Sequence, residues 1–466
     1  MKKYKILFAL SALLFMTSCA DSFFETEPSD KVTGDKIYKT ASDFNLAVIG
    51  CYGKLQDTDH YNFYLECVEF RSDNAQYKAP KTGTQNRYDI DQFRENSANG
   101  TLQSVWGTFS NGVYRCNLIL DQIDGADFDA TLKDQYKAEA MFLRAYNYFN
   151  MYRLWGGVPT TRKVVTVAEA LKIPRSSDQE MYDYIAGDLK YIIDNNMLPE
   201  SYGKDDLGRV TAGAARAMLG KVYLTFHKWT EAKDVLAPVI GKYSLLKNPA
   251  DIFDVNNKMN KEIIFAIRFN KSIVDEGHGM WFQTSASSSD YQTPQLKAAY
   301  NDPADLRADL ITLTQAGNAF AIKKYFDTPD ATYTKQYGND FILLRYADVL
   351  LMYAEALNEV SYSNSQTSEA MQALTDVRER AGLKAIDIAT LPNKEAFRKV
   401  LSEERQREFP FEGHRWFDLV RMGYAKEAMA AVGHTVNDYQ LVYPIPQKEI
   451  EKIGNKSILW QNEGYN

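Results

Sequence analysis

The densest cluster of ionisable side chains in this sequence lies between Glu403 and Arg421. Four of its side chains are of the types that act as general acids and bases. They are Glu404, Glu408, His414 and Asp418. Glu403 and Arg407 have the i, i+4 spacing of an ion pair on one helical face, and Phe, Trp and Leu are interleaved with the charges. Because charged groups beside so much aromatic surface usually pair with one another inside a fold, we interpret the cluster as structural.

Other motifs for catalysis or metal binding are absent from the sequence. It contains no GxSxG, P-loop, GxGxxG or HExxH, and its five histidines are scattered. We therefore expect no metal ion and no cofactor. A glycosidase-type pair of acids stays open, because the chain has 61 Asp and Glu and such a pair needs proximity only in space.

Aromatic side chains are abundant, with 30 Tyr, 24 Phe and 6 Trp. Two polar, loop-like regions near 60–115 and 270–340 carry several of them, and aromatics on loops usually pack or bind. Sugar rings stack on aromatic faces, while their hydroxyls need polar partners. We predict a ligand site here, although each tyrosine could instead pack on the scaffold. The candidate stacking residues are Trp281, Phe282, Tyr291, Tyr77 and Tyr88, and the candidate hydroxyl partners are Asp73 and Asn74.

The N-terminus has the pattern of a secretory signal peptide. Three lysines precede an apolar run at 6–16, which is too short to cross a bilayer. The run ends just before Cys19, as in a bacterial lipoprotein signal whose cysteine is acylated. We expect a signal peptide at 1–18, a lipid-anchored polar tether at 19–33 and one domain at 34–466. An ordinary signal peptide with an incidental cysteine is the alternative.

The charge and the cysteines exclude further classes. The net charge is −7, and removal of the signal peptide would lower it by three. An acidic chain without a basic stripe is a poor nucleic-acid binder. Cys51, Cys67 and Cys116 would remain after lipidation, with no CxxC pair, and we expect buried thiols.

Helical periodicity dominates the rest of the chain. Apolar residues recur at i, i+3, i+4 and i+7 in three segments, at 138–152, from about 211, and at 343–360. The second segment is followed by a partner segment at 230–236, and the third by one at 368–381. In the pair at 211–236, small and large residues alternate as in tetratricopeptide repeats. The prediction is a mostly α fold of tetratricopeptide-like helix pairs, with irregular loop-rich insertions and a few short strands, one of them at 262–269.

Four segments together resemble the SusD/RagB family. The first runs over 140–159, from AMFLRAYNYF to LWGGVP. The others are 344–357 (LRYADVLLMYAEAL), 404–421 and YPIP at 443–446 with QNEGY at 461–465. Together with the lipoprotein signal, they span essentially the whole chain in the expected order.

The resemblance implies a cell-surface lipoprotein of the outer membrane. Such proteins capture glycans, or in some members peptides, and deliver them to a SusC-like TonB-dependent transporter, without being enzymes. The matching motifs belong to the scaffold and do not identify a ligand. Two alternatives stay open, namely an extracellular all-α glycoside hydrolase and a peptide- or glycopeptide-binding lid on the same transporter.

Overall fold

The computed structural model of the chain describes residues 38–77, 84–279, 292–316, 319–327 and 337–465. Its N-terminal half contains helices α3 (Ala41–Leu55), α4 (Tyr64–Glu69), α5 (Gln85–Asp91), α6 (Gly100–Leu120), α7 (Ala130–Trp155), α8 (Val167–Ala170), α9 (Asp178–Asp194), α10 (Ala212–Thr225) and α11 (Trp229–Leu236). Its C-terminal half contains α13 (Pro294–Ala299), α14 (Tyr346–Val360), α15 (Glu369–Arg380), α16 (Lys394–Glu408), α17 (Arg415–Met422), α18 (Ala425–Ala431) and α19 (Gln447–Ile453). The strands are β1 (Ile263–Ile267), β2 (Leu313–Ala316), β3 (Ala319–Ile322) and β4 (Phe341–Arg345).

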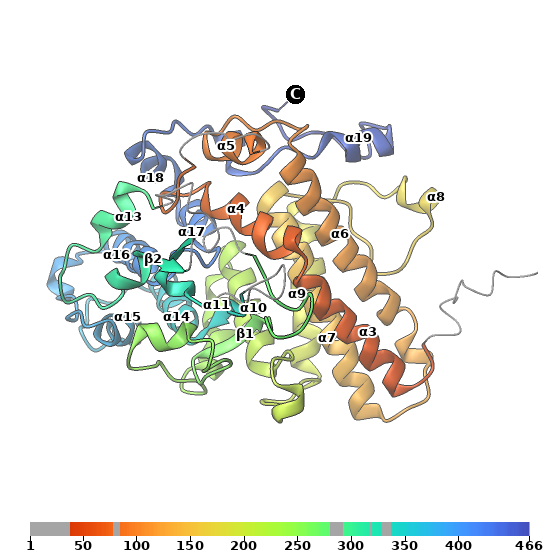
Figure 1. The fold of residues 1–466 in the computed structure, drawn as a ribbon, viewed down its shortest axis with the longest axis horizontal. Helices are drawn as coiled ribbons and strands as arrows, with labels where there is room; N and C mark the ends of the chain where they lie inside the picture. The colour runs from red at the N-terminus through yellow and green to blue at the C-terminus, as the bar shows by residue number, and fades with distance from the viewer. Residues whose placement is uncertain (1–37, 78–83, 280–291, 317–318, 328–336, 466) are drawn as a thin grey trace, which may run out of the picture.

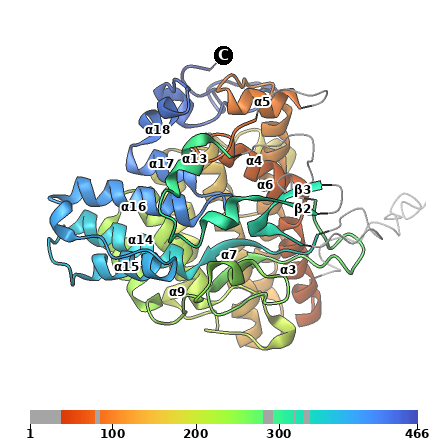
Figure 2. The ribbon, with the colours of Figure 1, turned by 60° about the vertical axis from the view of Figure 1, so that its left-hand side comes forward.

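The long helices form an array in which each packs on the next. α3 lies on α6, α6 on α7, α7 on α9, α9 on α10, α10 on α11, α11 on α14, and α14 on α15. Figure 1 shows this array running from α3 on the right to α14 and α15 on the left, and Figure 2 shows α16 and α17 above α14. Such stacking of neighbours is the architecture of helical-repeat proteins, so the predicted fold class is confirmed.

Close helix packing in the pair α10–α11 follows from a small residue facing a large one. A Cβ added at Gly220 would lie 2.4 Å from a methyl carbon of Leu236, so only glycine permits this approach. α7 ends at Trp155, and Gly156, which caps it, has a φ of 74°. An added Cβ at Gly157 would lie 1.9 Å from the carbonyl oxygen of Ser176. The glycines therefore stop α7 and let segment 157–176 turn back against it.

Two predicted elements differ in the structure. The helix expected from Leu343 begins at Tyr346, because 341–345 form β4, which pairs antiparallel with β1. The expected strand at 262–269 is confirmed as β1. The region near 60–115 that was expected to be loop-like contains α4, α5 and most of α6, so Tyr88 lies on a helix. The three cysteines Cys51, Cys67 and Cys116 are buried free thiols, as expected.

Within the described ranges, every helix is too short or too polar to span a membrane.

Candidate functional site

The two regions predicted to hold a ligand meet in space. Ala75 forms an antiparallel bridge with Gln292, and the Thr293 backbone N–H donates to the Asn74 carbonyl oxygen at 3.0 Å. The Gln76 side-chain amide donates to the Gln292 carbonyl oxygen at 3.3 Å. We call the contact between 72–77 and 292–293 the loop junction. It joins segments more than 200 positions apart in the sequence.

The loop junction rests on side chains from the C-terminal helices. Arg415 at the start of α17 donates to both carboxylate oxygens of Asp73, at 2.7 and 2.8 Å. Gln406 on α16 donates from one nitrogen to the carboxylate of Asp73 at 3.0 Å and to the amide oxygen of Asn74 at 3.2 Å. Bidentate arginine–carboxylate pairs fix orientation as well as charge. α16 and α17 therefore hold the backbone of the loop junction in place.

Asp73 and Asn74 do not lie as the sequence suggested. Their side chains are buried, at 5% and 0% exposure, and both contact the helices underneath. The oxygens that were expected to bind a ligand accept from Arg415 and Gln406 instead. This burial favours a structural role over a ligand role for both residues. The sequence did not reveal this role, because Arg415 lies 342 positions away from Asp73.

Asp73→Asn is expected to lower the free energy of unfolding by about 3 kcal/mol, because it leaves the buried Arg415 guanidinium without its counter-charge. Denaturant unfolding measures this change. Asp89→Asn, at a half-exposed aspartate on α5, is the matched control and is expected to change stability by less than about 0.5 kcal/mol. A loss of ligand retention by Asp73→Asn without a loss of stability would contradict the structural role.

The Tyr77 backbone contacts a buried carboxyl of α5, the helix that carries Tyr88. The Tyr77 backbone N–H donates to the Asp91 carboxylate at 3.0 Å, and Tyr88 is one turn before Asp91 on α5. Burial raises the pKa of Asp91 to about 6. Tyr77 is half-buried with its ring 5.2 Å edge-on from that of Phe70. Part of each tyrosine remains accessible, so both stay candidates for stacking.

Tyr88 is also covered on one side by an arginine. The Arg94 guanidinium lies 5.0 Å from the centre of the Tyr88 ring, and Arg94 also contacts the Asp89 carboxylate at 3.4 Å. A second arginine, Arg87, lies 5.0 Å from the Phe63 ring centre and pairs with the buried Glu66 at 2.7 Å. α5 and the turn after it thus present aromatic and guanidinium groups together, and both kinds can contact a sugar. The sequence interpretation missed these arginines, although their spacing beside Tyr88 was visible.

A buried histidine anchors the second region. His278 forms an antiparallel bridge with Tyr337, and its ring lies 4.8 Å from that of Phe269 and 6.1 Å from that of Tyr61. Burial lowers the pKa of His278 to about 3, so the ring is neutral at physiological pH. The Gly279 N–H donates to the Tyr61 hydroxyl at 3.3 Å. The aromatic surroundings therefore fix the chain immediately before 280–291.

Trp281, Phe282 and Tyr291 lie outside the described residues. The chain that carries them leaves the described structure at Gly279 and re-enters it at Gln292. Its two ends are therefore held by the His278 surroundings and by the loop junction.

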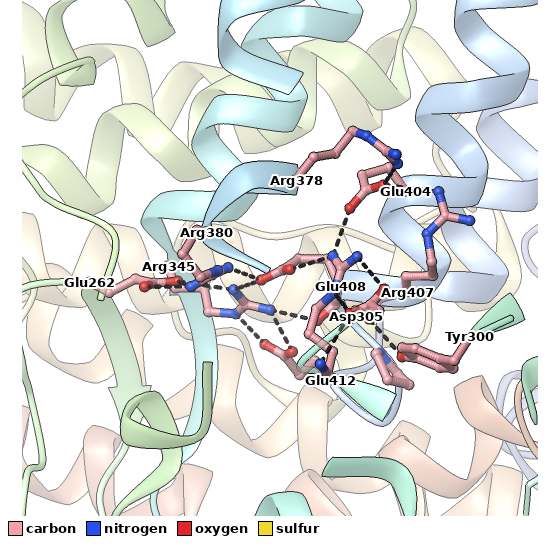
Figure 3. A network of polar contacts seen from close by, with 12 residues as sticks. Glu262, Tyr300, Asp305, Arg345, Arg378, Arg380, Glu404, Arg407, Glu408 and Glu412 are labelled. Atoms are coloured by element: carbon pink, nitrogen blue, oxygen red, sulfur yellow. Dashed lines mark hydrogen bonds and ion pairs between the residues drawn. The ribbon is translucent and has the colours of Figure 1, made fainter. Parts of the chain in front are cut away.

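The cluster at 403–421 forms buried ion-pair networks. Figure 3 shows Arg345 among Glu262, Glu408 and Glu412, with contacts of 3.1, 2.6 and 2.8 Å. Glu404 accepts from Arg307, Arg378 and Arg407 at 2.6, 2.7 and 2.9 Å. The sequence paired Arg407 with Glu403, and this is wrong. Glu403 faces solvent, while Glu404 lies on the buried side of α16.

A second network lies beside the first. Asp348 accepts from Lys221 and Arg405 at 2.7 and 2.9 Å, and Asp418 from Arg405 and Arg421 at 2.7 and 2.9 Å. Arg405 and Arg421 outweigh the effect of burial and lower the pKa of Asp418 to about 2. In the first network, the arginines around Glu404 likewise lower its pKa to about 2. Carboxyls fixed in the charged form cannot donate a proton near neutral pH. The structural interpretation of Glu404, Glu408, His414 and Asp418 therefore agrees with the geometry.

No group of three or more His, Cys, Asp or Glu side chains in the described part of the chain could hold a metal ion.

Two family models match the chain. The model described as "SusD family" matches residues 247–465, and that described as "Starch-binding associating with outer membrane" matches 33–224. Among curated relatives, SusD-like protein P38 of Formosa agariphila is 27% identical, with 96% of this chain and 97% of that protein covered. Starch-binding protein SusD of Bacteroides thetaiotaomicron is 24% identical, with 88% and 87% covered.

Solved structures share the fold over nearly their whole length. A laminarin-binding SusD-like protein superimposes with a TM-score of 0.77 at 24% identity, covering 92% of this chain and 100% of that one. Surface glycan-binding protein A of Bacteroides thetaiotaomicron, solved with laminarihexaose, has a TM-score of 0.76 at 22% identity, with 90% and 99% covered.

Proposed function

The chain belongs to the SusD/RagB family, and from that premise we propose that it is a non-catalytic, carbohydrate-binding lipoprotein of the outer membrane. Its ligand is an oligo- or polysaccharide, which it delivers to a SusC-like TonB-dependent transporter. The names of its relatives support carbohydrate as the ligand class, since they are called starch-binding, laminarin-binding and glycan-binding proteins.

The observation that carries the proposal is the loop junction. It brings the region of Tyr77 and Tyr88 against the end of the region that contains Trp281, Phe282 and Tyr291. Aromatic rings on two adjoining segments can stack on successive sugar rings, and nearby arginines and amides can bind hydroxyls. A rigid base keeps such a surface in place, which limits the entropy lost on binding.

A panel of soluble glycans tests this function. Affinity electrophoresis of the pure protein is expected to show retention by at least one glycan, with no product formed on incubation. Release of shorter sugars would overturn the proposal and favour the all-α glycoside hydrolase. Binding of peptides alone would favour the peptide- or glycopeptide-binding lid.

Trp281→Ala is expected to weaken retention by the bound glycan about tenfold, because a stacked indole face contributes about 1.4 kcal/mol or more. Trp460→Ala is the matched control, since Trp460 is 45% exposed and its ring lies 5.5 Å from the Arg175 guanidinium. The control is expected to keep wild-type retention. Equal retention by both variants would remove Trp281 from the site.

Cys19→Ala is expected to move the protein from the membrane fraction to the soluble fraction, because it removes the acylated thiol. Fractionation of cells followed by immunoblotting measures the distribution. Cys51→Ala removes a buried thiol of the fold and is expected to leave the protein membrane-bound. A Cys19→Ala protein that still sediments with membranes would contradict lipid anchoring.

A further inference from the structure

An apolar groove lies beside α6, where it is lined both by core residues and by exposed side chains. It has a volume of about 610 Å³ and is bounded by α6, by α19 and by the strap, which we define as residues 159–173 and which includes α8. Figure 1 shows the strap standing away from α6 and α19. The volume is in the range of sites that bind small molecules or peptide side chains.

The groove is lined mainly by hydrophobic side chains. Trp106 and Tyr148 form its base, and Val165, Val167 and Leu171 line it from the strap. Val167 is 78% exposed, Tyr114 is 48% exposed and Leu171 is 37% exposed. Apolar side chains grouped around a concavity usually mark a binding surface, because each exposed apolar area is unfavourable in water.

The chain itself contains a segment suited to this groove. Residues 19–37 are polar except for a few side chains, and Phe23 and Phe24 stand together among Asp21, Glu25 and Glu27. No other aromatic residue stands between positions 20 and 37 of the sequence. Because each buried phenylalanine contributes about 1.5–3 kcal/mol, the pair could hold a peptide in a groove of this size.

The described chain starts close to the groove. Tyr38 packs on Phe44 of α3 with ring centres 5.4 Å apart, and α3 packs along α6. α6 carries Tyr114, one of the residues that line the groove. The chain between Phe24 and Tyr38 can extend by roughly 45–50 Å, so it reaches the groove easily.

The charges of the segment and of the strap are complementary. Residues 20–30 contain four acids and no base, whereas the strap carries Arg162, Lys163 and Lys172 with a single acid, Glu169. Arg162 pairs with Asp188 in the core, whereas Lys163 lines the groove together with Lys452 and Glu449 of α19. Opposite charges at a rim favour the correct partner and orientation.

We propose that the groove between α6, the strap and α19 binds the N-terminal segment of this same chain, with Phe23 and Phe24 as its anchors. The inference is independent of the glycan. If Cys19 is acylated as proposed above, only three residues lie between Cys19 and Phe23. The groove then determines which face of the protein turns toward the membrane.

A photo-crosslinking experiment on the full-length lipoprotein in detergent tests this proposal. p-Benzoylphenylalanine in place of Phe24 is expected to crosslink within one chain to α6, the strap or α19, as mapped by mass spectrometry. Val167→Glu with Leu171→Glu is expected to lower the crosslink yield about tenfold. These positions are solvent-accessible, so a melting temperature near that of wild type confirms that the variant is folded.

A matched control uses Val32→Ser, which removes an apolar side chain from the same segment outside the anchors and is expected to keep the yield. Crosslinks to any other surface, crosslinks between two chains, or no crosslinks at all would each overturn the proposal. So would a yield that Val167→Glu with Leu171→Glu leaves unchanged.

Discussion

Glu408→Gln is expected to lower the free energy of unfolding by about 3–5 kcal/mol. Glu408 is buried at the end of α16, where its carboxylate accepts from Arg345 at 2.6 Å, from Arg307 at 2.8 Å and from Arg380. Glutamine preserves the shape but removes the charge, and its NH2 group then faces guanidinium donors. The loss of this carboxylate leaves buried positive charge uncompensated, and an uncompensated buried charge strongly destabilises the fold.

The consequence extends beyond α16, because the network connects distant parts of the chain. Arg345 ends β4, Arg307 lies in the loop before β2, and Arg380 ends α15. All three meet at a helix whose Gln406 supports the loop junction. We therefore expect the variant to loosen the base of the candidate site as well as the scaffold.

Glu403→Gln is the control for this experiment. It makes the same chemical change on the same helix, but Glu403 faces solvent, so its effect is expected to stay within about 0.5 kcal/mol. Denaturant unfolding with a common m-value compares the two. An effect of Glu408→Gln below about 1 kcal/mol would show that the network contributes little to stability.

The helical array could be predicted from sequence because its signals are local. Apolar periodicity located α7, α10, α14 and α15, and the small residue Gly220 opposite Leu236 indicated a close helix pair. β4 was missed because its residues, FILLR, also suit a helix. Only its pairing with β1, some 80 positions earlier, makes it a strand.

The candidate site could be predicted only by region. Residue type drew attention to Asp73 and Asn74, but type does not reveal that Arg415 and Gln406 cover them. Tyr88 seemed to lie on a loop because the short helix α5, QNRYDID, has too few apolar residues for a periodic pattern. Contacts between distant segments decide which polar side chains remain available to a ligand. The spacing of residues in the sequence does not predict these contacts.

Acid is expected to unfold the protein steeply below about pH 4.5, after little change between about pH 8 and 5. The buried carboxylates cause the steep loss of stability below pH 4.5. Neighbouring cations lower the pKa of Glu404 and Asp418 to about 2, and lower those of Glu408 and Asp348 further. Unfolded carboxyls have pKa values near 4, so their stabilisation is fully present above that pH and is lost as the pH falls toward 2.

Two other sets of groups offset one another at higher pH. Burial lowers the pKa of His60 to about 4 and of His414 to about 3, so their stabilisation is lost as the pH falls below about 6.5. Burial raises the pKa of Glu66 to about 8 and of Glu69 to about 7, and these two stabilise increasingly as the pH falls from 8 toward 4.5. The two sets change the free energy of unfolding in opposite directions over the same pH range, which explains why we expect little net change between about pH 8 and 5.

Unfolding curves in denaturant at a series of pH values measure this dependence. Four carboxylates that bind protons only after unfolding give a slope of about 5 kcal/mol per pH unit near pH 3, which would exhaust a typical domain stability within about two or three units. Glu408→Gln is expected to reduce the slope by about one proton, whereas Glu403→Gln leaves it unchanged. Because buried pairs are poorly screened, 0.5 M salt should move the acid midpoint little. A slope of one proton or less, or a midpoint that follows the salt concentration, would assign acid unfolding to surface charges and not to the buried networks.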